Sequence, residues 1–112
     1  MVDKYPVITL CGSTRFKDEF EKVQKKLTLQ GNIVISVGFF SHWENKDDYI
    51  LPKTRKMLDD IHKRKIDISD SIFVINVGGY IGEGTKSEIE YALSHGKEVK
   101  YLEEKEEENN GN

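Results

Sequence analysis

The sequence of 112 residues contains a single cysteine, Cys11, and has little proline and tryptophan. One cysteine excludes an internal disulfide, and no Cys/His group has zinc spacing, so we expect neither a metal nor a cofactor. Long apolar runs are also missing, because the first one, residues 7–11, stops at Gly12. This run is too short for a signal peptide or a membrane span. We therefore expect a cytoplasmic protein with no membrane partner.

Over most of the chain neither positive nor negative charge predominates. The formal net charge of −3 owes much to the acidic segment 103–108, so the rest is close to neutral. A nucleic-acid partner is not expected, because such proteins carry a one-sided basic excess. The length allows one domain, which we place at residues 1–102, followed by an acidic, disordered tail at 103–112.

What is present is a regular alternation of apolar runs and amphipathic segments. Strands are predicted at residues 6–11, 33–37, 71–77 and 97–102. The first two lack polar alternation, which is typical of strands buried on both faces, and the third is the most apolar and hence expected at the centre.

Helices are predicted between these strands. The first runs from Phe16 to Gly31, the second from Pro52 to about Ser69, and the third over residues 88–95 with Thr85 or Ser87 as its cap. Residues 39–51 have no clean period and are expected to form a loop. The order β-α-β-α-β-α-β predicts an α/β fold: a small Rossmann-like or flavodoxin-like parallel sheet of about four strands, flanked by helices.

In such sheets ligands bind beyond the carboxyl ends of the strands, which directs attention to two loops. The first contains Gly12, Ser13, Thr14 and Arg15 between a strand and a helix. Backbone N–H groups, two hydroxyls and a guanidinium at a helix start favour an anion such as a phosphate. The alternative is a plain turn with a serine cap and a solvated arginine.

The second loop is rich in glycine and precedes the third predicted helix. Gly79 and Gly82 let the main chain approach a ligand, and Tyr80 can stack on one. Glu88 is expected in the first helical turn, facing the crevice that the two loops border. The alternative for Glu88 is a carboxylate that only interacts with the helix dipole.

The sequence resembles the nucleoside 2-deoxyribosyltransferase-like superfamily in three segments. They are Cys11-Gly-Ser-Thr-Arg15, Asp70-Ser-Ile-Phe-Val-Ile-Asn76 and Gly84-Thr-Lys-Ser-Glu-Ile-Glu-Tyr-Ala92. The similarity covers about residues 6–102 and is nearest to the 2′-deoxynucleoside 5′-monophosphate N-hydrolase branch. The resemblance implies that the first loop holds a 5′-phosphate and that Glu88 is the nucleophile at the anomeric carbon. It also implies a homodimer or a higher homo-oligomer.

The chain departs from the family where an aspartate is expected to assist the leaving base. Counting back from Asp70 by the family spacing reaches His62 instead. Three alternatives follow. His62 can donate a proton to the leaving base near neutral pH, or Asp59 or Asp60 can do so if the helix register differs. In the third alternative the protein has lost hydrolysis and kept nucleotide binding. The interpretation of His62 as a surface or capping residue also stays open.

Two further polar side chains are candidate substrate contacts. Asn76, at the end of the third strand, can reach sugar hydroxyls or cap its own loop, and Ser87 can meet a phosphate in its own or a neighbouring subunit. The sequence predicts an N-glycosidase or N-glycosyl transferase acting on a (deoxy)nucleoside 5′-monophosphate. The alternative is a non-catalytic nucleotide sensor using the same crevice.

Overall fold

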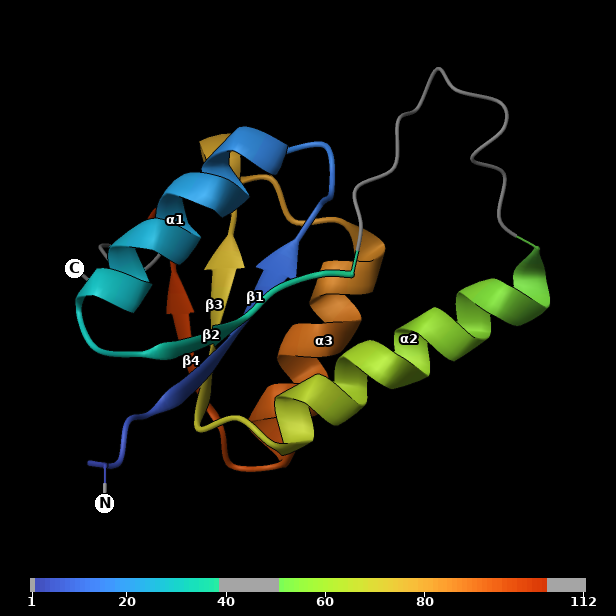
Figure 1. Cartoon of the computed structure of the whole chain (residues 1–112). Helices are drawn as coiled ribbons and strands as arrows, with labels where there is room; N and C mark the ends of the chain where they lie inside the picture. The colour runs from blue at the N-terminus through green and yellow to red at the C-terminus, as the bar shows by residue number, and fades with distance from the viewer. Residues whose placement is uncertain (1, 39–50, 105–112) are drawn as a thin grey trace, which may run out of the picture.

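The computed structural model describes residues 2–38 and 51–104, which form a four-stranded sheet with helices on both of its faces (Figure 1). The elements are β1 Val7–Gly12, α1 Lys17–Leu29, β2 Ile33–Ile35, α2 Pro52–Asp67, β3 Ser71–Ile75, the 3-10 turn η2 Val77–Gly79, α3 Glu83–Ser94 and β4 Glu98–Tyr101. All strand pairs are parallel and lie in the order β2-β1-β3-β4. The predicted α/β fold with a four-stranded parallel sheet is therefore confirmed.

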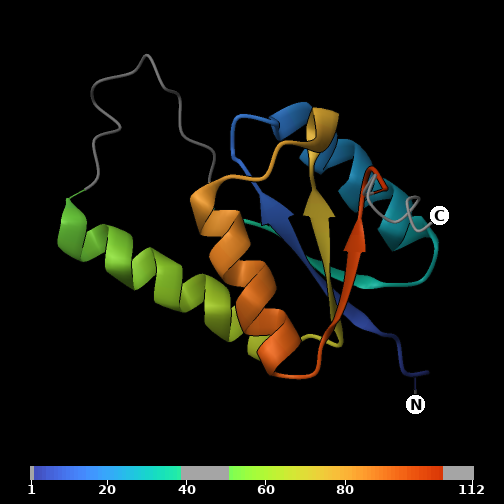
Figure 2. The same ribbon diagram turned by 180° about the vertical axis from the view of Figure 1, so that it is seen from behind.

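The sheet separates two apolar layers because successive strand side chains point to opposite faces. Helix α1 covers one face, and α2 and α3 lie together on the other (Figures 1 and 2). The buried residues of the α1 layer are Ile8, Leu10, Phe20, Val23, Leu27 and Ile75. Those of the α2 and α3 layer are Cys11, Ile66, Ile72, Val74 and Ala92. The neighbours β1 and β3 thus supply side chains to both layers, which agrees with the central position expected for the third strand.

The winding direction of the chain reverses between β1 and β3. From the end of β1 the chain passes through α1 to β2 on one side, and from the end of β3 it passes through α3 to β4 on the other. Connections that leave two adjacent parallel strands in opposite directions leave an opening at their carboxyl ends. The first turn, α2 and α3 all border this region.

Helix α2 is fixed to the sheet through its C-terminal half. The Thr9 and Ser69 hydroxyl oxygens lie 2.6 Å apart, and they lie 3.2 and 2.8 Å from the carbonyl oxygen of Lys65, so the two hydroxyl protons are shared within this group. The N-terminal half extends beyond the sheet (Figure 2), and Met57 is half exposed there. Within residues 2–38 and 51–104, no helix is both long and apolar enough to span a bilayer.

Two predictions about local structure were wrong. Strand β2 is not buried on both faces: it is the sheet edge, only three residues long, and Ile33 is exposed. Helix α3 begins at Glu83 after an extended Gly82, so neither Thr85 nor Ser87 caps it. A glycine inside a helix costs only about 0.5–1 kcal/mol, and Gly84 is accommodated in the first turn beside the dipole-compatible Glu83.

The folded part also reaches beyond the expected boundary at residue 102. Glu103 donates its backbone N–H to the Asn76 side chain, and its carbonyl accepts from the Asn76 amide, at 2.8 and 3.0 Å. Its carboxylate accepts the N–H of Gly78 at 2.8 Å. Glu103 is thus part of the fold. Residues 39–50 of the loop predicted over 39–51, and residues 105–112 of the tail predicted over 103–112, lie outside the described residues.

Candidate functional site

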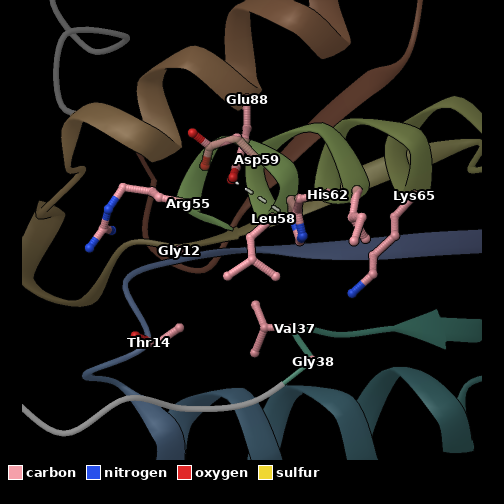
Figure 3. Close-up of a pocket in the computed structure, with 11 residues that line it drawn as sticks. Gly12, Thr14, Val37, Gly38, Arg55, Leu58, Asp59, His62, Lys65 and Glu88 are labelled. Carbon is pink, nitrogen blue, oxygen red and sulfur yellow. Dashed lines mark ion pairs between the residues drawn. The ribbon is translucent and has the colours of Figure 1, made fainter. Parts of the chain in front are cut away.

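A pocket of about 370 Å³ opens beside the first turn, between the end of β2, α2 and α3 (Figure 3). Its volume falls in the range of about 300–1,000 Å³ that is common for small-molecule sites. The described residues that line it are Gly12, Thr14, Val37, Gly38, Arg55, Leu58, Asp59, Ile61, His62, Lys65 and Glu88. Apolar walls with a few charged groups of both signs suit a ligand with an apolar ring and polar ends.

Three polar side chains from three different elements meet at the inner end of this pocket. Cys11 lies at the end of β1, with Sγ 3.5 Å from Nε2 of His62 on α2. The same Nε2 lies 3.9 Å from a carboxylate oxygen of Glu88 on α3, as the dashed line in Figure 3 shows. Cys11 is fully buried, His62 is buried, and the Glu88 side chain is 18% exposed. The prediction that Glu88 faces the crevice agrees with this geometry, although it stands in the second helical turn and not the first.

Burial sets the protonation of this cluster. It raises the pKa of Glu88 to about 7, and the negative charge of Asp59 raises it further, against the lowering effects of Cys11, Lys63 and Lys65. Burial also lowers the pKa of His62 to about 4, with a further lowering by the charge of Lys65. At neutral pH the imidazole is therefore neutral, and its contact with Glu88 is not a salt bridge between two full charges.

Cys11 is a thiol under the same conditions. Burial raises the pKa of this group well above its ordinary value, and the nearby Glu88 carboxylate raises it further. The sequence suggested no basic partner for Cys11, whereas the structure places an imidazole beside it. Because that imidazole is neutral, it does not convert the thiol into a reactive thiolate.

The first turn contributes only part of its predicted set to the pocket. Gly12 and Thr14 line it, whereas Ser13 and Arg15 do not appear among the described lining residues. The Ser13 hydroxyl accepts from the backbone N–H and from Nε of Arg15, at 3.3 and 3.2 Å. The Arg15 guanidinium lies over the Tyr80 ring, 4.6 Å from its centroid. The first turn and the glycine loop therefore meet as expected, through a stacked cation and ring.

The other residues predicted on the third strand and the glycine loop lie elsewhere. Both ends of the Asn76 amide are bonded to the Glu103 backbone, so this side chain stabilises the fold. Gly79 and Ser87 are exposed, and a side chain at Gly82 would meet the Tyr80 hydroxyl. In the part of the chain that the structure describes, none of the four lines the pocket.

Helix α2 supplies pocket residues that sequence reasoning missed or left open. Asp59 faces the pocket, whereas Asp60 pairs with Lys56 at 3.0 Å on the exposed side. Arg55 and Lys65 also line the pocket and lie on either side of the other labelled α2 residues (Figure 3). The spacing 55, 58, 59, 62 and 65 marks one face of a helix, and that spacing is the pattern that would have revealed them.

Comparison with protein-family models, with curated proteins and with solved structures found no match. The resemblance to the nucleoside 2-deoxyribosyltransferase-like superfamily therefore stays a prediction that rests on the motifs.

Proposed function

We propose that this protein is an N-glycosidase, or an N-glycosyl transferase, that cleaves the base–sugar bond of a (deoxy)nucleoside 5′-monophosphate. The observation that carries the proposal is Glu88: a carboxylate in a nucleotide-sized pocket, with a pKa raised to about 7 by burial. Such a group is substantially ionised near neutral pH but poorly solvated. A desolvated carboxylate is suited to attack a carbon that acquires positive charge.

The proposed reaction proceeds in two steps. A Glu88 oxygen forms a bond to the anomeric carbon while the bond to the base nitrogen breaks and its electron pair leaves with the base. Water, or a second base in the transferase case, then attacks the same carbon and releases the carboxylate. Asp59 lines the pocket and acts on Glu88 as a negative charge, so it is proposed to accept the proton of the attacking water in the second step. His62 is poorly suited to protonate the leaving base, because a pKa of about 4 leaves little imidazolium at neutral pH.

The phosphate is proposed to lie near the first turn, between Thr14 and the Arg55 guanidinium, both of which line the pocket. A guanidinium that pairs with a phosphate contributes roughly 1.5–3 kcal/mol. The motif assigned this role to Arg15, which here lies over Tyr80. Separate substitutions of the two arginines tell them apart.

We further propose a cytoplasmic homo-oligomer in which a neighbouring subunit completes the site. Support comes from the resemblance and from exposed apolar side chains along α2, which are Leu51 just before the helix and Met57 and Ile61 within it. Ile61 also lines the pocket, so a subunit that covered this face would border the ligand.

The test is release of free base from a panel of nucleotides and nucleosides, followed by chromatography. Glu88→Gln is expected to abolish release, while Glu90→Gln, an exposed position on the same helix, is expected to retain it. Arg55→Gln is expected to raise KM for monophosphates by roughly 10–100-fold and to leave nucleosides unchanged. Arg64→Gln, with an exposed side chain on the same helix, is the matched control. Release that persists in Glu88→Gln would refute the nucleophile, and an equal loss for both substrate types would refute the phosphate assignment.

A non-catalytic nucleotide sensor is the second candidate. The observation that favours it is the neutral His62 at the position where the resemblance implies an acidic group. Tight binding of a monophosphate by the unmodified protein, without any release of base, would support this alternative.

A further inference from the structure

The Cys11, His62 and Glu88 cluster brings together a sulfur, a nitrogen and an oxygen donor. The three ligand atoms all lie within 4.8 Å of one another. They come from β1, α2 and α3, so the sequence carries no local metal motif. Two of the three residues line the pocket, which gives a path for a small ion and room for a water molecule.

The spacing of these atoms is close to what one tetrahedral ion needs. With metal–ligand bonds of about 2.0–2.3 Å, neighbouring donors around Zn²⁺ lie roughly 3.3–3.6 Å apart. The Sγ to Nε2 distance is 3.5 Å, and Nε2 to the carboxylate oxygen is 3.9 Å. The third pair, Cys11 Sγ and the Glu88 carboxylate oxygen, lies within 4.8 Å, so a change in the Glu88 side-chain torsions has to bring this oxygen closer to the other two atoms before all three can bind one ion.

The charges of the cluster also suit a divalent cation. A thiolate, a carboxylate and a neutral imidazole sum to two negative charges, so the loaded site is neutral, which limits the cost of burial. When the metal–sulfur bond forms, the S–H bond breaks and its proton leaves to water in the pocket. Asp59 adds a negative charge nearby, while Lys63 and Lys65 act in the opposite sense.

The imidazole is oriented toward the other two donors. Nε2 is the ring nitrogen that lies nearest to both Cys11 Sγ and the Glu88 carboxylate oxygen. In the neutral ring this nitrogen can direct its lone pair at an ion placed between them.

We propose that Cys11, His62 and Glu88 form a binding site for a thiophilic divalent cation such as Zn²⁺, with pocket water as the fourth ligand. Three protein ligands and one open position are the arrangement of zinc sites that exchange or activate a ligand. This proposal reverses the expectation of no metal, which considered spacing along the sequence alone.

The test uses Co²⁺ as the probe, added to the full chain in the absence of nucleotide. One equivalent is expected to give a near-ultraviolet thiolate-to-cobalt band and intense visible bands of tetrahedral coordination, both removed by Zn²⁺. Cys11→Ser is expected to abolish the thiolate band, and His62→Gln and Glu88→Gln to weaken binding by roughly 100-fold or more. His95→Gln, an exposed histidine on the far end of α3, is the matched control and is expected to bind normally.

Because His62 and Cys11 are buried, a second measurement is made on the unsubstituted protein. X-ray absorption at the zinc edge is expected to show one sulfur at about 2.3 Å with nitrogen and oxygen at about 2.0–2.1 Å. Only nitrogen and oxygen neighbours, no thiolate band at all, or full binding by Glu88→Gln and His62→Gln would each overturn the proposal.

A consequence for catalysis rests on the proposed function. A cation held by Glu88 occupies the electron pair that would attack the sugar, so one equivalent of Zn²⁺ is expected to suppress base release. The two proposals fail separately, since cobalt spectra need no substrate and base release is measured with a chelator present.

Discussion

Replacing Glu88 with glutamine is expected to stabilise the fold at high pH and to leave its stability unchanged at low pH. The Glu88 side chain is 18% exposed, and burial raises its pKa from 4.5 to about 7. Each pKa unit corresponds to about 1.4 kcal/mol, so ionising Glu88 in the folded state costs about 3 kcal/mol more than in the unfolded chain. Glutamine has the same shape and carries no charge.

The sign follows from the direction of the pKa change. A carboxyl group with a raised folded-state pKa favours the folded state fully below its unfolded pKa of 4.5. That contribution is lost progressively as the pH rises to about 7, where the folded group ionises. The Glu88→Gln protein does not lose stability in this way. The unfolding free energy of Glu88→Gln is therefore expected to equal that of the unsubstituted protein near pH 4.5 and to exceed it by about 3 kcal/mol above pH 7.

The measurement is urea unfolding of both proteins at a series of pH values between 4.5 and 8.5. Titrating groups that do not contact Glu88 are common to both proteins and cancel in the difference. Glu90→Gln, at an exposed position on α3, is the control and is expected to give a difference that varies little with pH. A Glu88→Gln difference that stays constant over this range, or that favours the unsubstituted protein at pH 8, would refute the assignment of a desolvated carboxylate.

Two further predictions concern the stability of the fold. Gly12→Ala is expected to destabilise the protein by about 2 kcal/mol or more, because φ is +151° and a Cβ would lie 2.9 Å from the Ile75 carbonyl oxygen. Gly84→Ala, where nothing lies within 4 Å, is expected to be neutral or to stabilise by up to about 1 kcal/mol, and urea unfolding that gave equal effects at the two sites would contradict the steric argument. Asn76→Ala removes two hydrogen bonds to Glu103 from a side chain that is 2% exposed, so a loss of about 1–3 kcal/mol is expected. A change below about 0.5 kcal/mol in unfolding free energy would show that the two Asn76 hydrogen bonds contribute little to stability.

The fold was predictable because its signals are local and repeated. Apolar runs separated by helical periodicity predict a parallel sheet, and the run around Val74 predicts a central strand. The start of α3 was not predictable in the same way. Four glycines suggested a break in regular structure, yet Gly84 adopts helical backbone, since the favourable packing of the rest of the helix outweighs its small intrinsic cost.

The candidate site was predictable in part. Gly12 and Thr14 follow a strand and Glu88 comes after the glycine loop, and the ends of parallel strands and the segments that follow them meet at one edge. His62 and Asp59 were reached only through the spacing that the resemblance implies. The contact between Cys11 and His62 depends on how α2 crosses β1, and no pattern along the chain specifies that placement. Arg55 was missed for a different reason: it belongs to a helical face whose polar members look like ordinary surface residues.

The assembly of the cluster from β1, α2 and α3 has a consequence for fragments of the chain. No contiguous piece that lacks any one of these elements holds all three donor atoms, so uptake of a ligand there reports that the domain has formed as a whole. A bound ligand would also connect α2, whose N-terminal half extends beyond the sheet, to β1 and α3. Occupancy of the pocket and rigidity of that helix should consequently rise together.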